Sequence, residues 1–357
     1  MKLLCGVVLS ILYFLGSLGN AHAAITYNLT VITASGDPGP SINDSGQIAI
    51  GDRIRSASGT WTTLQVAGGT EEDPGVAAAW AINNLGQVGG MSSLGYQMPS
   101  AWQSNGTPIA LGEPISARGD AAITDINNNG QMVGFANDNG NGTSLFYGLS
   151  IGSFTDYGYS AAYGLNDLGV AVGSAITHAD IPANQAVMWT TAGMTLLDTR
   201  VTTDENNEIV DYGHSTAYDI NNLGQIIGWA EYENGVRATL WENGTMYDLG
   251  ALESNSASSA FAINEAGIAV GESSGRAVSF KDGQVLDLNM LVDPAALGDW
   301  TLTSATDINE QGWIVGTMSN GQLFLLKPIS PVPEPATWLM LIIGAFIAAR
   351  GKRITSA

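Results

Sequence analysis

Short apolar runs separated by polar turns follow one another along most of the chain, and one such pattern recurs seven times. Each copy has an apolar run, an Ile or Leu, an Asn, two variable residues, a Gly and a second apolar run. The copies begin at Ile42, Ile82, Ile126, Leu165, Ile220, Ile263 and Ile308. The asparagines are 40, 44, 39, 55, 43 and 45 residues apart. Two short apolar runs around a turn of this length predict a β-hairpin in every copy.

The turn residues have a clear conformational role. In the fifth copy, Asn221 can accept hydrogen bonds from the backbone N–H groups that follow it. Gly224 stands at the fourth position of the turn, where a type I turn favours glycine and positive φ is tolerated. The same two residue types recur at the same spacing in the other copies, so the same turn is predicted seven times.

A large aromatic residue follows each hairpin and predicts a third strand. The seven aromatics are Trp61, Trp102, Phe146, Trp189, Trp241, Phe280 and Phe324. We interpret them as core residues packed between neighbouring sheets. A fourth strand is predicted in the clearest copies, at 245–249 and 284–288.

Seven units of four short strands predict an all-β fold, a seven-bladed β-propeller. Its repeats of ~43 residues match the period of propeller blades. The seventh unit stops after its third strand, whereas the segment 27–32 is a strand without a unit of its own. We therefore expect the N-terminal strand to complete the seventh blade and close the ring. An open β-solenoid is the alternative, and it would not need this complementarity.

Composition and charge limit the function. The chain has 45 glycines and only 13% charged residues, which suits many short strands joined by turns. Its net charge of −21 would repel nucleic acid, so we expect no nucleic-acid partner. The single cysteine, Cys5, precedes the predicted domain, so no disulfide is expected there.

The N-terminus has the pattern of a signal peptide. Lys2 precedes an apolar run that ends in small residues, and Ala21-His22-Ala23 forms an A-x-A cleavage site. We predict a signal peptide over 1–23, with cleavage between Ala23 and Ala24, and a repeat domain over 24–328. An uncleaved membrane anchor is the alternative, although the apolar run is short for a span.

The C-terminus has three parts in order. A linker, 329–335, contains Pro333, Glu334 and Pro335, and an apolar stretch from Ala336 to Ala349 precedes a basic cluster. A basic cluster at this place would stay cytoplasmic, so the tail 336–357 is predicted to cross the inner membrane. A buried core helix is the alternative interpretation.

This tail resembles the PEP-CTERM sorting signal, in which Pro-Glu-Pro precedes an apolar helix and a terminal basic patch. The resemblance implies processing at Pro333, Glu334 and Pro335 by an exosortase-type membrane enzyme. It also implies a Gram-negative bacterium that makes exopolysaccharide. The expected location is the cell envelope, the cell surface or, after processing of the tail, the extracellular space.

The repeats resemble bacterial extracellular HAF repeats. The shared pattern is A-x-x-I-N-x-x-G-Q-x-x-G, an aromatic strand and a D-L-G ending, as in 217–228, Trp241 and 248–250. The resemblance covers nearly all of 25–327, although no repeat has the His-Ala-Phe triplet.

Candidate chemistry is sparse. Asp125, Asp219 and Asp307 each stand two residues before a repeat asparagine, so in a propeller they would lie on one circle. They could face one channel and bind a ligand or a cation such as Ca²⁺, or they could cap their own turns. No other cofactor is expected. The sequence around His214, 211–215, holds an acid, a base and a hydroxyl, but a triad needs geometry between distant segments.

These observations favour a non-catalytic surface propeller that binds extracellular polysaccharide or an envelope protein. Two alternatives remain open. A carbohydrate-active enzyme would carry carboxylates in one funnel, with the long interval near 190–215 as a candidate loop. A passive structural protein of the envelope would have no ligand.

Overall fold

A computed structural model of the chain describes residues 27–34, 39–95, 97–111, 120–138, 141–149, 151, 159–176, 183–200, 202–203, 209–211 and 213–329. One compact unit extends from Asn28 to Lys327, within the predicted domain 24–328. The predicted signal peptide, the Pro-Glu-Pro motif and the tail lie outside the described residues. Among the described helices, none is both long and apolar enough to span a membrane.

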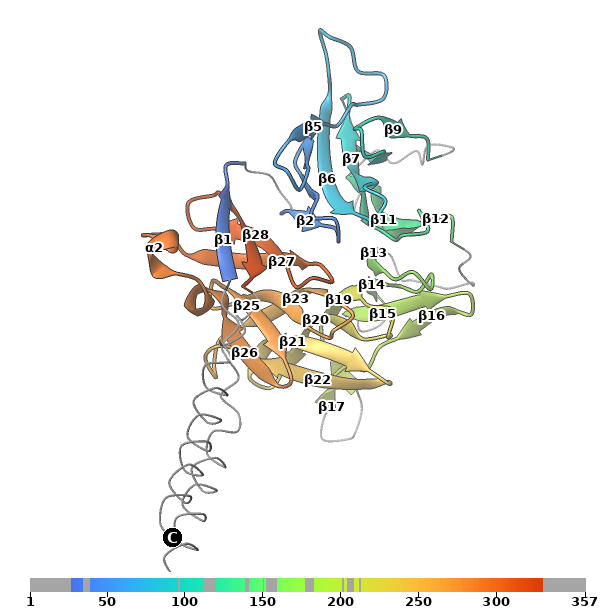
Figure 1. Cartoon of the computed structure of the whole chain (residues 1–357). Coiled ribbons are helices and arrows are strands. Elements are labelled where there is room, and N and C mark those ends of the chain that lie inside the picture. Colours follow the sequence, from blue (N-terminus) through green and yellow to red (C-terminus); the bar gives the residue numbers. More distant parts are fainter. Residues whose placement is uncertain are drawn as a thin grey trace, which may run out of the picture. The chain divides into compact units, whose positions relative to one another are not determined.

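The strands of the repeats form seven antiparallel sheets arranged as a seven-bladed β-propeller, as the repeats predicted (Figure 1). Blade 1 contains β2 (Ser41–Ile42), β3 (Ile48–Ile50), β4 (Arg53–Arg55) and β5 (Trp61–Thr63). Blade 2 contains β6 (Val76–Ile82), β7 (Val88–Ser93), β8 (Gln97–Trp102) and β9 (Pro108–Ile109). The described part of blade 3 contains β10 (Ala121–Ile126), β11 (Met132–Asp138) and β12 (Asn141–Tyr147). Blade 4 contains β13 (Ser160–Leu165), β14 (Ala171–Ile176), β15 (Asn184–Thr190) and β16 (Gly193–Leu196).

The remaining blades repeat this order. Blade 5 contains β19 (Ser215–Ile220), β20 (Ile226–Tyr232), β21 (Gly235–Glu242) and β22 (Thr245–Gly250). Blade 6 contains β23 (Ser258–Ile263), β24 (Ala269–Ser273), β25 (Arg276–Lys281) and β26 (Gln284–Asp287). Between blades 4 and 5, in the long interval, lies a hairpin of β17 (Thr202–Thr203) and β18 (Ile209–Asp211). A 3-10 helix η1 (Leu288–Leu291) and a short helix α2 (Pro294–Leu297) follow blade 6.

Blade 7 is completed by the N-terminal strand, as predicted. Its sheet order is β1 (Tyr27–Ile32), β29 (Leu323–Pro328), β28 (Ile314–Met318) and β27 (Leu302–Ile308). Ile32 is buried in an apolar cluster with residues of blade 7, such as Val315, and of blade 1, such as Ile48. The N-terminal strand therefore supplies both a sheet edge and part of the packing across the ring closure.

The hydrophobic core lies between adjacent blades. One cluster joins Val133 of blade 3 to Trp189 of blade 4, and another joins Val172 of blade 4 to Trp241 of blade 5. Five of the seven predicted core aromatics are nearly inaccessible to solvent: Trp102, Trp189, Trp241, Phe280 and Phe324. Interdigitation of such large side chains excludes water from the blade interfaces.

The first blade departs from the predicted strand order. Arg55 occupies the cross-strand position opposite Ile48 that Trp102 occupies opposite Val88 in blade 2. Trp61 lies instead on β5, the fourth strand of the blade, so its assignment to a third strand was wrong. The reason is a short turn between β3 and β4, which places the third strand earlier in the sequence of this unit.

A β-bulge recurs in the innermost strand of six blades. The pairing with the second strand shifts by one residue at Trp80, Thr124, Tyr163, Tyr218, Phe261 and Thr306. A bulge places an extra residue on one strand and redirects neighbouring side chains. This bulge decides what faces the centre of the ring.

Candidate functional site

The repeat asparagines form a closed ring of hydrogen bonds around the centre of the propeller. Each side-chain Nδ2 donates to the backbone carbonyl of the asparagine in the next blade, over 2.9 to 3.2 Å. The ring runs through Asn43, Asn83, Asn127, Asn166, Asn221, Asn264 and Asn309 and returns to Asn43. The predicted turn is also confirmed, since the Oδ1 of each asparagine accepts from backbone N–H groups of its own turn, as Asn83 does from Leu85 and Gln87.

The next residue of every turn forms a second ring. Its backbone N–H donates to the side-chain oxygen of the corresponding residue in the next blade, over 2.8 to 3.2 Å. The members are Asp44, Asn84, Asn128, Asp167, Asn222, Glu265 and Glu310. Only side chains with an acceptor oxygen can close this ring, which explains why the position is Asn, Asp or Glu in every repeat.

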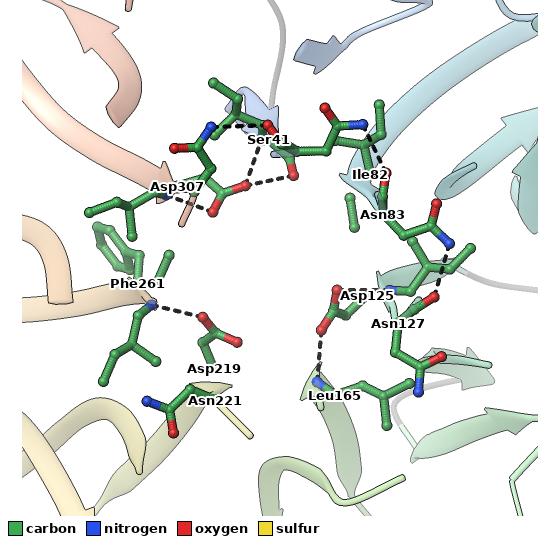
Figure 2. A pocket seen from close by; sticks show the side chains of 18 of the residues that line it. Ser41, Ile82, Asn83, Asp125, Asn127, Leu165, Asp219, Asn221, Phe261 and Asp307 are labelled. Atoms are coloured by element: carbon green, nitrogen blue, oxygen red, sulfur yellow. Dashed lines mark hydrogen bonds between the residues drawn. The ribbon is translucent and has the colours of Figure 1, made fainter. Parts of the chain in front are cut away.

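The three predicted aspartates lie on the innermost strands and face the centre of the ring (Figure 2). One oxygen of each accepts from the N–H of the following residue, over 2.7 Å. The other accepts from the innermost strand of the next blade: Asp125 from Leu165, Asp219 from Ile263 and Asp307 from Ile42. The carboxylates therefore connect blade 3 to 4, blade 5 to 6 and blade 7 to 1.

These carboxyl groups are difficult to ionise. Burial raises the pKa of Asp219 to about 6 and the pKa of Asp307 to about 7. Burial, followed by the charge of Asp219, raises the pKa of Asp125 well above its usual range. The backbone N–H bonds act in the opposite direction but do not compensate for the loss of water. The mutual repulsion also indicates that the three side chains share one electrostatic environment.

Aromatic side chains line the same space and were not predicted as site residues. Trp80, Tyr163, Tyr218 and Phe261 all stand three residues before a repeat asparagine. In a regular strand this position would point away from the face that the neighbouring aspartate position occupies. Because of the bulge, both positions face the centre. The common spacing from the asparagine was the only sequence signal that could have found them.

Together these groups surround a cavity of about 700 Å³ at the centre of the propeller. Its described lining includes the acids Asp44, Asp125, Asp167, Asp219, Glu265, Asp307 and Glu310. No Lys, Arg or His is among these lining residues. The volume lies within the range of small-molecule sites.

The predicted cation site and the predicted ligand site at the three aspartates have different outcomes. Within the described residues, no group of three or more His, Cys, Asp or Glu side chains is placed to hold a metal ion. The alternative role as caps of their own turns stays a prediction, because the N–H that each aspartate accepts belongs to the last residue of its own strand, before the turn asparagine. Calcium binding at this set has no geometric support among the described residues, whereas ligand binding in the cavity stays a prediction.

The other candidate cluster does not form a triad in the described residues. The Nδ1 of His214 accepts a hydrogen bond from the Asn184 N–H over 3.3 Å, and Ser215 Oγ accepts from the Ala186 N–H over 2.9 Å. Both groups thus stabilise the junction of β15 and β19. Tyr212 and His178 lie outside the described residues.

The chain is similar to one protein family and to a solved structure. A family model described as "Protein of unknown function (DUF3466)" matches residues 151–323. No curated protein matches the chain. Among solved structures, the chain is similar to a catalytically inactive variant of virginiamycin B lyase from Staphylococcus aureus with quinupristin. That match has 13% sequence identity and a TM-score of 0.46, and it covers 85% of this chain and 100% of the other.

Proposed function

We propose that this protein is an exported, non-catalytic β-propeller that binds extracellular polysaccharide in its central cavity. The observation that carries the proposal is the cavity of about 700 Å³, in which carboxylates and aromatic rings from successive blades face one space. Aromatic faces and planar polar groups are the chemistry by which proteins recognise sugar rings, and a lining of this kind is typical of binding sites.

A binding role is favoured over catalysis because the buried carboxylates already have structural partners. Both oxygens of Asp125, Asp219 and Asp307 accept backbone N–H groups that hold adjacent blades together. A general acid or a nucleophile needs an oxygen that can reach the substrate. Ligand contact through ring faces does not require these bonds to break.

Export and anchoring belong to the proposal on sequence grounds. The predicted signal peptide (1–23) and the tail (336–357) would place the propeller in the envelope, with an exosortase-type enzyme acting near Pro333, Glu334 and Pro335. Replacing Glu334 by Ala should leave the tail uncleaved in the producing cell. Immunoblotting of membrane and medium fractions measures this, and unchanged release would argue against the sorting signal.

The test of function is co-elution of the purified protein with the exopolysaccharide of its producer, followed for hours by light scattering. Binding predicts that the protein elutes with polymer of unchanged size. If the protein elutes alone and the polymer is unchanged, polysaccharide recognition is wrong.

A carbohydrate-active enzyme is the second candidate. The observation in its favour is the pair Asp219 and Asp307, whose pKa values are raised by burial to about 6 and about 7 in one cavity. A raised carboxyl pKa is the property of a general acid in glycoside hydrolysis. Shortened polymer in the same experiment would favour this candidate.

A further inference from the structure

The charges around the central cavity are of one sign. Its described lining contains seven acidic side chains and no basic one. The three buried aspartates receive only neutral backbone N–H groups and one hydroxyl, that of Ser41, as partners. No basic side chain among these lining residues pairs with the acids, and a bound cation would favour ionisation of the three aspartates, whose pKa values burial raises.

The side-chain amides of the repeat asparagines already make structural hydrogen bonds. In blade 2, Asn83 donates to Gln87 and to the carbonyl of Asn127 and accepts from two N–H groups of its own turn. Every repeat asparagine donates to the next blade and accepts from its own turn, but only four of the seven also donate to a Gln four residues further on. The ring of asparagines is therefore largely committed to the structure. The carboxylate oxygens also have backbone partners, but each can accept a further hydrogen bond, so we assign recognition to the carboxylates and the aromatic rings.

The aromatic rings form a continuous group across three consecutive blades. Tyr163 packs against Tyr218 with ring centroids 5.7 Å apart, and Tyr218 packs against Phe261 at 5.6 Å. Tyr218 and Phe261 directly precede Asp219 and Ala262, the positions that face the cavity in their blades. Aromatic faces attract cations, and the attraction increases where water is excluded.

We infer that the central cavity binds a protonated amine, presented by an amino sugar of the polysaccharide. This inference rests on the proposed function and narrows its ligand. The ammonium group would lie between the aspartates and the rings of Tyr163, Tyr218 and Phe261, where it offsets the repulsion between carboxylates. A polymer of sugar acids would meet the same charge and be excluded.

Calorimetry with three forms of one saccharide tests the inference on the full chain. Glucosamine oligomers, their N-acetylated counterparts and their N-trimethylated counterparts differ only at nitrogen. The free-amine oligomer, at a pH where it is protonated, and the N-trimethyl oligomer should bind roughly tenfold or more tightly than the N-acetyl oligomer. Equal affinity for all three forms would overturn the inference.

Substitutions in the cavity lining test where the amine binds. Asp307→Asn and Phe261→Leu should each reduce the preference for the amine, the first by removing charge and the second by removing a ring face. Asp282→Asn removes the same charge at the exposed turn of blade 6, outside the cavity lining, and should leave the preference intact. Circular dichroism confirms folding, and Phe261→Leu provides the test if loss of the Asp307 bonds unfolds the ring. An unchanged preference in folded Phe261→Leu and Asp307→Asn would contradict the site.

The binding measurements distinguish failure of this inference from failure of the proposed function. If the N-acetylated oligomer binds as well as the amine form, the cavity binds saccharide without selecting an amine. If no saccharide binds in any form, the proposed function itself is wrong.

Discussion

Each repeat asparagine acts as a junction between its own turn and the next blade. In blade 2, the amide of Asn83 donates two hydrogen bonds and accepts two, which is the full capacity of the group. An aspartate has the same shape but no donor when ionised. The repeated choice of Asn at this buried position therefore follows from the need to donate across the blade interface.

Replacing Asn83 by Asp tests this role. The ionised carboxylate would leave the Asn127 carbonyl without its donor, so we expect the free energy of unfolding at neutral pH to fall by about 2 kcal/mol or more. The loss should shrink at low pH, where the acid can donate. Urea denaturation measures both effects. Asn222→Asp is the control, because Asp44 and Asp167 occupy the equivalent position, and an equal loss there would contradict the argument.

In the blades with a bulge, a glycine on the second strand lies opposite the residue that precedes the bulge. In blade 5 the residue before the bulge, Ala217, pairs with Gly228. A Cβ on Gly228 would lie 1.9 Å from the carbonyl oxygen of Thr216, and the corresponding distance is 2.0 Å at Gly90, Gly134, Gly173, Gly271 and Gly316. The two backbones approach too closely for a side chain, and this approach positions the bulged residue at the cavity.

Gly228→Ala should therefore be costly although the added group is a single methyl. Because backbone atoms would have to move, we expect a destabilisation of about 1–3 kcal/mol together with a shift of the Tyr218 ring. Thermal denaturation and the near-ultraviolet circular dichroism of the aromatic residues measure these changes. Thr245→Ala, on the exposed edge strand β22, is the control. Full stability of Gly228→Ala would refute the close approach.

The ring as a whole depends on segments that are distant in sequence. Blade 7 takes strands from both ends of the domain, and Asn309, Glu310 and Asp307 all bond to blade 1. The same two rings of hydrogen bonds then connect every blade to the next. Closure makes the propeller cooperative, since each interface is supported on both sides.

Deleting residues 24–34 should open this closure. The deletion removes β1 and the buried Ile32, and burial of one such side chain contributes roughly 1.5–3 kcal/mol. With the lost sheet edge, we expect the melting temperature to fall by at least about 10 °C. Calorimetry measures the shift, and Val31→Ser, an exposed change on β1, serves as the control. An unaltered melting curve would defeat the closure model.

Stability should also depend on pH through the buried aspartates. Their pKa values in the folded protein, about 6 for Asp219 and about 7 for Asp307, exceed the value near 4 expected in the unfolded chain. The folded state therefore holds these protons more tightly, and its stability is greatest below pH 4 and declines as pH rises towards 7. Repulsion from Glu265 at Asp219, and from Asp219 at Asp307, acts in the same direction.

Chemical denaturation between pH 4 and pH 8 checks the direction of this change in stability with pH. We expect the free energy of unfolding to decrease over this range by several kcal/mol, on the scale of ~1.4 kcal/mol per unit of pKa shift. Asp307→Asn should flatten the curve, whereas Asp282→Asn should not. A stability that rises with pH would show that the aspartates are paired with positive charge in solution.

The sequence by itself determined the number of blades, the hairpin turns and the strand that closes the ring. The blades follow from the sevenfold repeat, and the turns follow from residues such as Gly224 that suit one backbone conformation. The closing strand follows because the segment 27–32 belongs to no repeat and the seventh repeat lacks a fourth strand. The sequence pattern assigned Trp61 to the third strand of blade 1 instead of the fourth. The pattern of apolar residues does not reveal the short turn between β3 and β4 that causes this difference.

Only the tertiary structure decided which side chains share the cavity. Strand alternation would place Tyr218 and Asp219 on opposite faces, and the bulge brings both to the centre. The raised pKa of Asp307 and its bond to Ile42, 265 residues away, depend on burial and ring closure. Such properties arise from contacts between distant segments, and no local pattern of residues specifies them.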